Sequence, residues 1–548
     1  MHEAPRESNG LIGEREPVDP ECLPFTGVPH STRLFTDFLY HFPNVQRFYP
    51  RPPALLEWFK DEQQRIQIPQ DRRKRVAAIL EGQNRELGAG AKTLQNIQRL
   101  KDGAPVIVTG QQVALFGGPT FSLLKALTVV LLAEKTGAVP VFWLATEDHD
   151  FAEINFVHLP AGDHLETLST LPPHQEGLPS GKIVFDESIS ASVKQVEELL
   201  GNSTLFEVLK ESYRPGENFG SAFGKFYARA FAELGLIFLN PIDPELHRIA
   251  QPVFRDSLRN WKEINGELQQ REQELESAGY HAQVKVTASH TLCFYFRDGV
   301  RTPVRHDGEN KFAIGDRLVT EDELIAETET HPERFSANVL LRPIMQDYLL
   351  PTLCYSGGPA ETAYFAQVEV VYRKLLGRVT PVVPRTSATL VEPRQAKLLD
   401  RYQLKLTDLF TRGPEKLREL VAGKALPDSI MKSFDSAAEH LDQALSAIHG
   451  PLEKLDKTLA DAAANAGSKM RYQLQSLRDK AARAESRKNA ETQQHADELS
   501  TLLYPNKNLQ EREIGSAYFL LKYGTAILEK LREKVQPNCF DHQIIPLG

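Results

Sequence analysis

The chain has 548 residues, a formal net charge of −9 and a pI near 6.0, and 41% of its residues are hydrophobic. This length exceeds that of one ordinary domain, and the composition is typical of a folded globular protein. The acidic balance disfavours a broad nucleic-acid-binding surface, which requires an excess of basic residues. The longest apolar stretch, residues 123–137, contains Lys125 and is too short to span a bilayer. We therefore expect neither nucleic acid nor a membrane as a partner.

The four cysteines, Cys22, Cys293, Cys354 and Cys539, are widely separated, and the sequence has no CxxC pattern. This spacing predicts neither a disulfide framework nor a four-cysteine zinc site, and it favours a reducing compartment. We expect a cytoplasmic protein. Cys354 lies in an apolar run, where a lone cysteine is more often a core residue than a nucleophile.

Three regions are predicted along the chain. Residues 1–25 form a flexible polar tail, residues 26–385 an α/β domain with a Rossmann-like core, and residues 386–548 an α-helical coiled-coil domain. Within the α/β domain, the segments near 160–220 and 262–335 interrupt the alternation of strands and helices. We interpret these two segments as insertions that connect parts of the core.

A parallel sheet is predicted from a strand–helix–strand unit. Residues 104–110, "APVIVTG", and 138–146, "AVPVFWLAT", have the β-branched and apolar content of buried strands. Residues 119–137 between them predict a helix, with Pro in its first turn and Gly at its C-terminal cap. Asp243 is predicted to cap a later helix, and "RDGV" at residues 297–300 predicts a hairpin. A helix that connects two strands within about 45 residues implies that the strands are parallel.

The coiled-coil prediction rests on apolar residues at seven-residue spacing. The first run has the two rows Met431, Ala438, Leu445, Leu452, Leu459, Ala466 and Phe434, Leu441, Ile448, Leu455, Ala462. A second, weaker run includes Met470, Leu474, Leu477, Ala481 and Ala484. Such rows form the contact seam of a coiled coil. Pro451 predicts a kink or break, and Gly467 and Ser468 are candidates for a turn between two helices. The pattern allows either a coil between two chains or a hairpin within one chain.

Two Gly-Gly-Pro sequences each stand between an apolar run and a helical one, at residues 117–119 and 357–359. Gly117, Gly118, Gly357 and Gly358 are therefore candidates for binding the phosphates of a nucleotide. A helix start offers free N–H groups and a positive dipole end, and glycine lets a ligand approach the backbone closely. The alternative is that these glycines only form turns.

The stretch "WLATEDHDFAEIN" places acids and a histidine where the second predicted strand ends. In an extended chain, Asp148 and Asp150 share one side and could orient an amine or sugar hydroxyls. His149, on the other side, is a candidate general base or phosphate ligand. Gln112, in the first strand-to-helix turn, is a further candidate catalytic residue. The alternatives are capping of the next element by the acids, or a divalent metal site, to which we assign no residue.

Basic residues near later strands are candidate anion contacts. Arg342 suits a carboxylate or phosphate because its guanidinium is a planar fork, although an ion pair with Asp347 or Glu361 is an equal alternative. Arg385 and Ser387 follow a strand and are candidates for a second phosphate contact.

Five motifs together resemble one family, the bacillithiol biosynthesis cysteine-adding enzymes called BshC. They occur in the same order from about Ser31 to the C-terminus: "TGQQVALFGGPTFSLLKA", "PVFWLATEDHDFAEIN", "RPIMQDYLLPTLCYSGGPAETAYFAQ", "PRTSATLVEP" and "LQER…YFLLKYG". The resemblance implies a Rossmann-like core with two connecting insertions, distantly similar to class I aminoacyl-tRNA synthetases, and a coiled coil that builds a homodimer. The chain lacks literal HIGH and KMSKS motifs.

The resemblance also implies a reaction. The enzyme would join the carboxyl group of cysteine to the amine of glucosaminyl-malate, with ATP as the expected activator, and would give bacillithiol. Relatives of this kind resemble proteins that hold a nucleotide away from the main cleft, near the coiled coil. Tyr504, Asn506 and Arg512 are the candidates for such a site here, and a structural docking loop is the alternative.

Two other functions remain open from the sequence. One is a Rossmann-like nucleotidyl- or glycosyltransferase, which would use the same acids to bind a metal–nucleotide complex. The other is a non-catalytic, nucleotide-binding coiled-coil scaffold of the same pathway. The density of polar residues at the predicted sheet edge argues against a pure scaffold.

Overall fold

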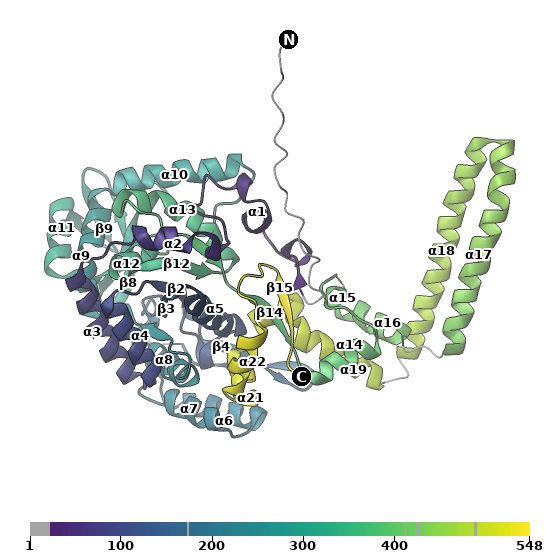
Figure 1. Ribbon diagram of the computed structural model, residues 1–548, viewed down its shortest axis with the longest axis horizontal. Helices are drawn as coiled ribbons and strands as arrows, with labels where there is room; N and C mark the ends of the chain where they lie inside the picture. Colours follow the sequence, from purple (N-terminus) through teal and green to yellow (C-terminus); the bar gives the residue numbers. More distant parts are fainter. Residues whose placement is uncertain (1–21, 173–174, 412, 425–427, 487–489) are drawn as a thin grey trace, which may run out of the picture.

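The computed structural model describes residues 22–172, 175–411, 413–424, 428–486 and 490–548, and it contains a five-stranded parallel sheet at its centre (Figure 1). The strand order is β13-β12-β2-β3-β6. The strands are β2 (Val106–Gln111), β3 (Val139–Leu144), β6 (Ile237–Leu239), β12 (Thr352–Gly357) and β13 (Val382–Pro384). This confirms the predicted Rossmann-like core. The order reverses between β2 and β12, because β3 and β6 lie on one side of β2 and β12 and β13 on the other.

The crossover helices of this sheet begin and end at the residues that the sequence indicated. Helix α5 (Thr120–Thr136) connects β2 to β3, with Pro119 before its first residue and Gly137 after its last at φ +73°. Helix α9 (Pro244–Arg259) has Asp243 as its N-cap, whose side chain accepts a hydrogen bond from the Glu245 amide. Helix α13 (Pro359–Leu375) follows β12 in the same way. The caps predicted at Gly137 and Asp243 are thus confirmed, whereas Pro119 is the N-cap of α5 and lies just before its first turn.

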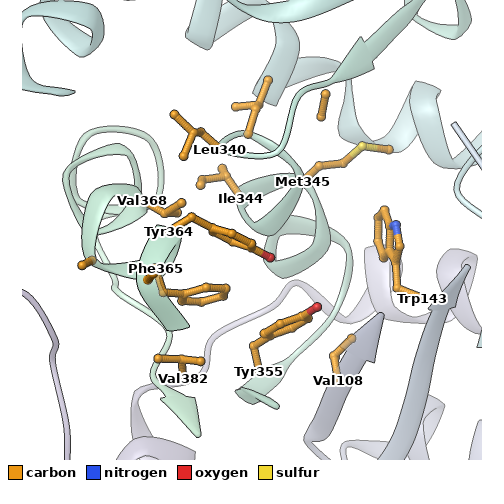
Figure 2. Close-up of a cluster of buried hydrophobic side chains, with 14 of the residues drawn as sticks. Val108, Trp143, Leu340, Ile344, Met345, Tyr355, Tyr364, Phe365, Val368 and Val382 are labelled. Atoms are coloured by element: carbon orange, nitrogen blue, oxygen red, sulfur yellow. The ribbon is translucent and has the colours of Figure 1, made fainter. Parts of the chain in front are cut away.

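The hydrophobic core extends over both faces of the sheet. Figure 2 shows one part of it, where Trp143 and Tyr355 of the strands approach Met345 and Ile344 of α12 (Arg342–Leu349). Helix α5, in the middle of Figure 1, is buried around almost its whole circumference. This explains why its sequence is a continuous apolar run without a polar stripe.

In the part of the chain that the structure describes, four α-helices precede the first core strand, and they do not all pack on the same face of the sheet. They are α1 (Arg33–Tyr40), α2 (Leu55–Arg65), α3 (Gln70–Glu86) and α4 (Ala91–Asp102). Buried residues of α1, α3 and α4 belong to one hydrophobic cluster, and Leu55 and Trp58 of α2 belong to the cluster around α5. Asn84 fixes α3 to the edge strand, because its side chain donates to the Phe238 carbonyl (2.7 Å) and accepts from the Phe238 amide (2.9 Å).

Two segments interrupt the core. Between β3 and β6 lie the hairpin β4 (Phe156–Ala161) and β5 (His164–Ser169), then α6 (Ile189–Leu200), α7 (Thr204–Ser212) and α8 (Phe219–Ala230). Between α9 and α12 lie α10 (Trp261–Ser277), β7 (His290–Arg297), β8 (Val300–His306), β9 (Lys311–Ile314), β10 (Arg317–Thr320), α11 (Glu321–Thr330) and β11 (Phe335–Ala337). Strands β7 and β8 form the hairpin predicted at "RDGV", with Asp298 and Gly299 at its turn.

The C-terminal region is mainly helical, and in Figure 1 a long helical hairpin projects from it, away from the body. The helices of the C-terminal region are α14 (Pro393–Arg401), α15 (Leu406–Thr411), α16 (Pro414–Lys424), α17 (Asp428–Leu455), α18 (Lys457–Ser486), α19 (Ala490–Leu503), α20 (Gln510–Glu513), α21 (Ser516–Tyr523) and α22 (Ala526–Lys534). Helices α17 and α18 pair within one chain, and Arg471 binds Asp442 across them (2.8 Å). No helix in the described ranges is long and apolar enough to cross a membrane.

The turn of this hairpin lies at Asp456, so the prediction of a turn at Gly467 and Ser468 is wrong. The Asp456 carboxylate accepts from the Thr458 amide (2.8 Å) and thereby caps α18. Gly467 remains helical, and a Cβ atom there would lie 2.9 Å from a methyl carbon of Leu445. The glycine therefore allows the two helices to approach closely. Pro451 lies inside α17, one turn before its end.

A small three-stranded sheet joins both ends of the described chain. Strand β15 (His542–Pro546) pairs in parallel with β14 (Ser387–Val391) and antiparallel with β1 (Cys22–Leu23). Residues 22–25 of the predicted tail are therefore part of the folded body, and Phe25 is buried. Residues 1–21 lie outside the described residues.

A buried ion pair holds the C-terminal segment on the core. Glu511 accepts from Arg385 Nη2 (2.7 Å), Ser387 Oγ (3.0 Å) and the Ala388 amide (2.9 Å). Burial alone would raise the pKa of Glu511, but the attraction of Arg385 outweighs it and holds the pKa below its ordinary value. His542 lies beside this pair, hydrogen-bonded to Ser387, and burial lowers its pKa to about 4.

The burial of His542 predicts a pH-dependent loss of stability. Its ordinary pKa is about 6.5, so the unfolded chain takes up a proton first as the pH falls. The free energy of unfolding should therefore decrease by about 3 kcal/mol between pH ~6.5 and ~4. Urea unfolding of His542→Asn should lack this part of the decrease.

His440→Asn is the matched control, because His440 is exposed on α17. It should keep the pH dependence of the wild type. An unchanged pH dependence in His542→Asn would show that His542 is not held neutral by its surroundings.

Candidate functional site

A cavity of about 760 Å³ lies at the carboxyl ends of the core strands, between the sheet and the second insertion. Its floor includes Gln111 at the end of β2, Asp148 after β3 and Tyr355 of β12, and its opposite wall includes residues of β7 and β8. This edge contains the point where the strand order reverses, between β2 and β12. Open α/β sheets bind their ligands at such a point, so this cleft is the candidate functional site.

One side of the cleft is a network around Asp148. Gln112 Nε2 donates to Asp148 Oδ2 (2.8 Å) and to Glu153 Oε2 (2.5 Å). Asp148 Oδ1 accepts from the amides of His149 (2.8 Å) and, more weakly, Asp150 (3.4 Å). Three of the candidate catalytic residues, Gln112, Asp148 and His149, thus lie together at the wall of the cleft.

Asp150 does not join them, because it is exposed and lies outside the cleft lining. Strand β3 ends at Leu144, a turn follows at residues 146 and 147, and residues 148–150 belong to no strand. The expectation that Asp148 and Asp150 share one side assumed an extended strand, and it is wrong because only Asp148 lines the cleft.

Arg301 of β8 is a site residue that the sequence reasoning missed. Its side chain is 9% exposed and reaches across the cleft wall to His149, with Nη1 3.3 Å from Nδ1 of the ring. Its Nη2 donates to the Ala337 carbonyl (2.6 Å), and its guanidinium lies 4.0 Å from the centre of the Phe294 ring. The sequence showed only a hairpin here, and nothing in it indicated that the hairpin folds back onto the sheet edge.

The contact with Arg301 determines which nitrogen of His149 carries a proton. A guanidinium only donates hydrogen bonds, so Nδ1 of His149 accepts and the neutral ring has its hydrogen on Nε2. Burial lowers the pKa of His149, Arg301 lowers it further, and Asp148 and Asp150 offset this only in part. His149 is therefore a neutral hydrogen-bond donor at neutral pH.

Arg342, at the start of α12, lines the opposite part of the cleft. It donates to Gln346 Oε1 (3.0 Å) and to the Tyr364 hydroxyl (3.0 Å). The rings of Tyr355 and Trp143 lie 5.0 and 5.8 Å from its guanidinium carbon, and Figure 2 shows both rings with Tyr364 in this part of the core. Within the described residues Arg342 forms no ion pair, so its charge is available to an anionic ligand.

Asp347 and Glu361, the acids named above as alternative ion-pair partners of Arg342, interact with other residues. Asp347 accepts from Gln346 Nε2 (2.8 Å) and from the Tyr372 hydroxyl. Glu361 pairs with the buried Lys125, and its other oxygen accepts from the Gly358 amide (3.1 Å). Burial alone would raise the pKa of Glu361, but Lys125 and Arg385 outweigh it and keep the carboxylate charged.

Gly357 and Gly358 lie beside the cleft, and the Glu361 carboxylate occupies the start of α13. A Cβ at Gly357 would lie 2.6 Å from Cβ of Glu361, and one at Gly358 would lie 3.1 Å from Nε of Arg385. The glycines allow this close packing.

Gly117 and Gly118 lie outside the cleft and are buried beneath the C-terminal segment. The Gly117 amide donates to the Tyr213 hydroxyl (2.9 Å), and its carbonyl accepts from Ser516 Oγ (3.0 Å). The Gly118 carbonyl accepts from the Ser516 amide (2.8 Å), and the Thr120 amide donates to the Ile514 carbonyl (2.8 Å). The polar groups at the start of α5 are thus used within the protein.

The remaining candidates do not line the cleft, although Arg385 lies beside Gly358. Arg385 and Ser387 belong to the Glu511 network. Tyr504 is buried against Phe410, with ring centres 4.8 Å apart, and Asn506 donates to Glu513 (2.8 Å). Arg512 is exposed, and its guanidinium carbon is 5.9 Å from the centre of the Phe121 ring. Among the residues that the structure describes, no group of three or more His, Cys, Asp and Glu is placed to hold a metal ion.

Removal of the Arg301 charge should raise the pKa of His149, because a nearby positive charge disfavours the imidazolium form. We expect this upward shift in Arg301→Met, by NMR titration with labelled histidine. In the wild type, ¹⁵N shifts should report the Nε2–H tautomer. The control is Arg305→Met, an exposed arginine of the same strand, which should leave His149 unchanged. A wild-type ring with its hydrogen on Nδ1 would contradict the Arg301 contact.

Comparisons with known proteins agree with this architecture. Residues 20–386 match the family model of the bacillithiol biosynthesis BshC N-terminal Rossmann-like domain, and residues 388–547 match that of the BshC C-terminal coiled-coil domain. A protein of Koribacter versatilis named "Putative cysteine ligase BshC" is 46% identical over 534 residues, which cover 96% of this chain and 99% of the relative.

Two further relatives carry the same name. The protein of Solibacter usitatus is 34% identical over 96% of this chain and 99% of its own length. The protein of Salinibacter ruber is 33% identical over 93% and 96%. These matches confirm the resemblance seen in the sequence and the assignment to an enzyme family. The chain belongs to the BshC family of bacillithiol biosynthesis, whose relatives are named as cysteine ligases.

Proposed function

We propose that this protein joins cysteine to glucosaminyl-malate through an amide bond, with ATP as the activator of the cysteine carboxyl group. The family supports a cysteine ligase. The cleft supports the acceptor, because the Arg342 guanidinium stands in it without an ion pair among the described residues. The malate part of the acceptor carries carboxylates, which a planar guanidinium binds through paired hydrogen bonds. This arginine is the observation that carries the proposal.

The reaction requires an activated carboxyl group and a free amine. In the proposed sequence the cysteine carboxylate attacks the α-phosphorus of ATP and pyrophosphate leaves. The glucosamine nitrogen then attacks the carbonyl carbon, AMP leaves, and the nitrogen loses a proton. Asp148, held by Gln112, is placed to orient the amine or the adjacent hydroxyl groups. Correct orientation in a cleft of this kind contributes much of the rate enhancement.

In this proposal His149 acts as a hydrogen-bond donor and not as a general base. Because its Nδ1 faces Arg301, its Nε2–H is the group that can act on a ligand. A donor at this position stabilises the negative charge that develops on the carbonyl oxygen during attack. Arg301 then acts through His149, as a positioning residue.

The nucleotide contacts are proposed at the start of α13. Gly357 and Gly358 are beside the cleft, and Lys125 and Arg385 provide positive charge nearby. A phosphate at the Gly358 amide would have to displace the Glu361 carboxylate. The loop with Tyr504, Asn506 and Arg512 is kept as the proposed second nucleotide region. We place the reaction in the cytoplasm, where ATP and reduced cysteine are available.

The first test is the reaction itself. Purified protein incubated with glucosaminyl-malate, cysteine and ATP should form bacillithiol and AMP, as measured by mass spectrometry. Bacillithiol with ADP would replace the adenylate by an acyl phosphate. No product from folded protein would contradict the proposal and favour the scaffold alternative, and turnover of a sugar nucleotide with Mg²⁺ would favour the transferase.

The role of Arg342 predicts a specific kinetic defect. Arg342→Met should lower kcat/KM for glucosaminyl-malate about 10- to 150-fold, the equivalent of a lost hydrogen bond to a charged group of ~1.5–3 kcal/mol. KM for ATP should change little. Arg373→Met is the control, because Arg373 is exposed and pairs with Glu369. An equal defect with an acceptor that lacks the malate carboxylates would show that Arg342 does not bind them.

We also propose a homodimer through the helical hairpin. The pairing of α17 with α18 leaves apolar side chains exposed, including Ile448 (47%), Met470 (49%) and Leu477 (56%). Met470 and Leu477 belong to the weaker heptad run on α18. A solvent-exposed heptad row is typical of a helix that contacts another helix.

The dimer should be visible in sedimentation. Wild type should sediment as a dimer, and the double variant Met470→Ser, Leu477→Ser as a monomer. Tyr472→Ser is the matched control, because this exposed residue of α18 (71%) lies off the heptad row. A monomeric wild type, or a double variant that remains dimeric, would contradict an interface on this row.

A further inference from the structure

Two thiols that are far apart in the sequence lie in contact beside the sheet of β1, β15 and β14. The sulfur atoms of Cys22 and Cys539 are 3.3 Å apart, although the residues are 517 positions apart in the chain. Strand β1 is paired antiparallel with β15, with Cys22 opposite Gln543. Cys539 lies three residues before β15. Neither cysteine is in a disulfide, and both side chains are partly exposed.

A hydrogen-bonded bridge holds the two segments in this position. The Phe25 amide donates to the Tyr40 hydroxyl (2.8 Å), and this hydroxyl donates to Asp541 Oδ1 (2.6 Å). Phe25 follows Cys22 on one side and Asp541 follows Cys539 on the other. Tyr40 therefore ties together the two segments that carry the thiols, so their encounter needs little additional ordering of the chain.

The other two cysteines are in a different situation. Cys293 is 2% exposed and Cys354 is not exposed at all. Burial raises the pKa of Cys293 to about 12 and also raises that of Cys354. Since the thiolate is the reactive form, these two residues are protected from oxidation. Selective oxidation is therefore expected at the partly exposed pair alone.

We propose that Cys22 and Cys539 are a redox modification site, which forms an intramolecular disulfide with low-molecular-weight disulfides as the oxidant. One cysteine loses its proton, and its thiolate attacks the small disulfide, which releases one small thiolate and leaves a mixed disulfide. The second cysteine, as thiolate, attacks the protein sulfur of that mixed disulfide and releases the second small thiolate. Two protein S–H groups are replaced by one S–S bond, and the oxidant is reduced to two thiols.

Closure of this bond joins the first described strand to the C-terminal segment. A cross-link between distant residues stabilises a fold mainly by constraining the unfolded chain. Neither cysteine lines the candidate active-site cleft. The oxidised form should therefore resist denaturation better than the reduced form and keep the same cleft. The inference does not depend on the proposed ligase reaction.

The test is oxidation of the full chain with glutathione disulfide, followed by intact mass and peptide mapping. Wild type should lose the mass of two hydrogens, and the peptides of Cys22 and Cys539 should be joined. Cys22→Ser and Cys539→Ser should each stop at a mixed disulfide with glutathione. The urea midpoint of oxidised wild type should shift upwards, dithiothreitol should reverse the shift, and both variants should lack it.

Several outcomes would overturn the proposal. They are a wild type that stops at the mixed disulfide, a cross-link between two chains, a bond that includes Cys293 or Cys354, or no reaction at all. Circular dichroism shows whether each serine variant is folded. If a serine variant is not folded, alkylation of native wild type replaces it: oxidation should protect these two thiols together, and separate protection would contradict the pair.

Discussion

The buried ion pair between Arg385 and Glu511 determines how the two parts of this chain fit together. Glu511 is 1% exposed, and a charge in such a place is costly unless a partner compensates it. If the C-terminal segment moved off the sheet, the buried charge of Arg385 would lose the Glu511 carboxylate that compensates it. The same segment brings Ser516 against Gly117. This packing explains why the first Gly-Gly-Pro sequence is a structural contact, while the second stands next to the cleft.

The cleft is built from two walls with different origins. The sheet edge supplies Asp148 and His149 on a turn, and the second insertion supplies Arg301 on a hairpin strand. The position of the proton on His149 is thus determined by Arg301, which is 152 residues away along the chain. The chemistry of this site depends on the position of the insertion over the sheet, and not only on the core.

The sequence predicted the local features of the fold well, because they depend on short patterns. Strands β2 and β3, the cap at Asp243 and the hairpin at "RDGV" follow from apolar runs and turn residues. The hairpin turn at Asp456 was missed, since Gly467 serves close packing with Leu445 and only the structure shows this contact. Arg301, Lys125 and the Cys22–Cys539 contact are products of tertiary structure, for which no local pattern exists.

The position of Glu361 has a consequence for ligand selection. One oxygen of this carboxylate accepts from the amide of Gly358, the N-cap residue of α13, and the other is at Lys125. The helix start therefore already holds an anion that is covalently part of the protein. Free inorganic phosphate must compete with this tethered anion and gains little by replacing it. In the proposed nucleotide site, a larger ligand has further contacts in the cleft that offset the loss of this carboxylate, so Glu361 would disfavour small anions there.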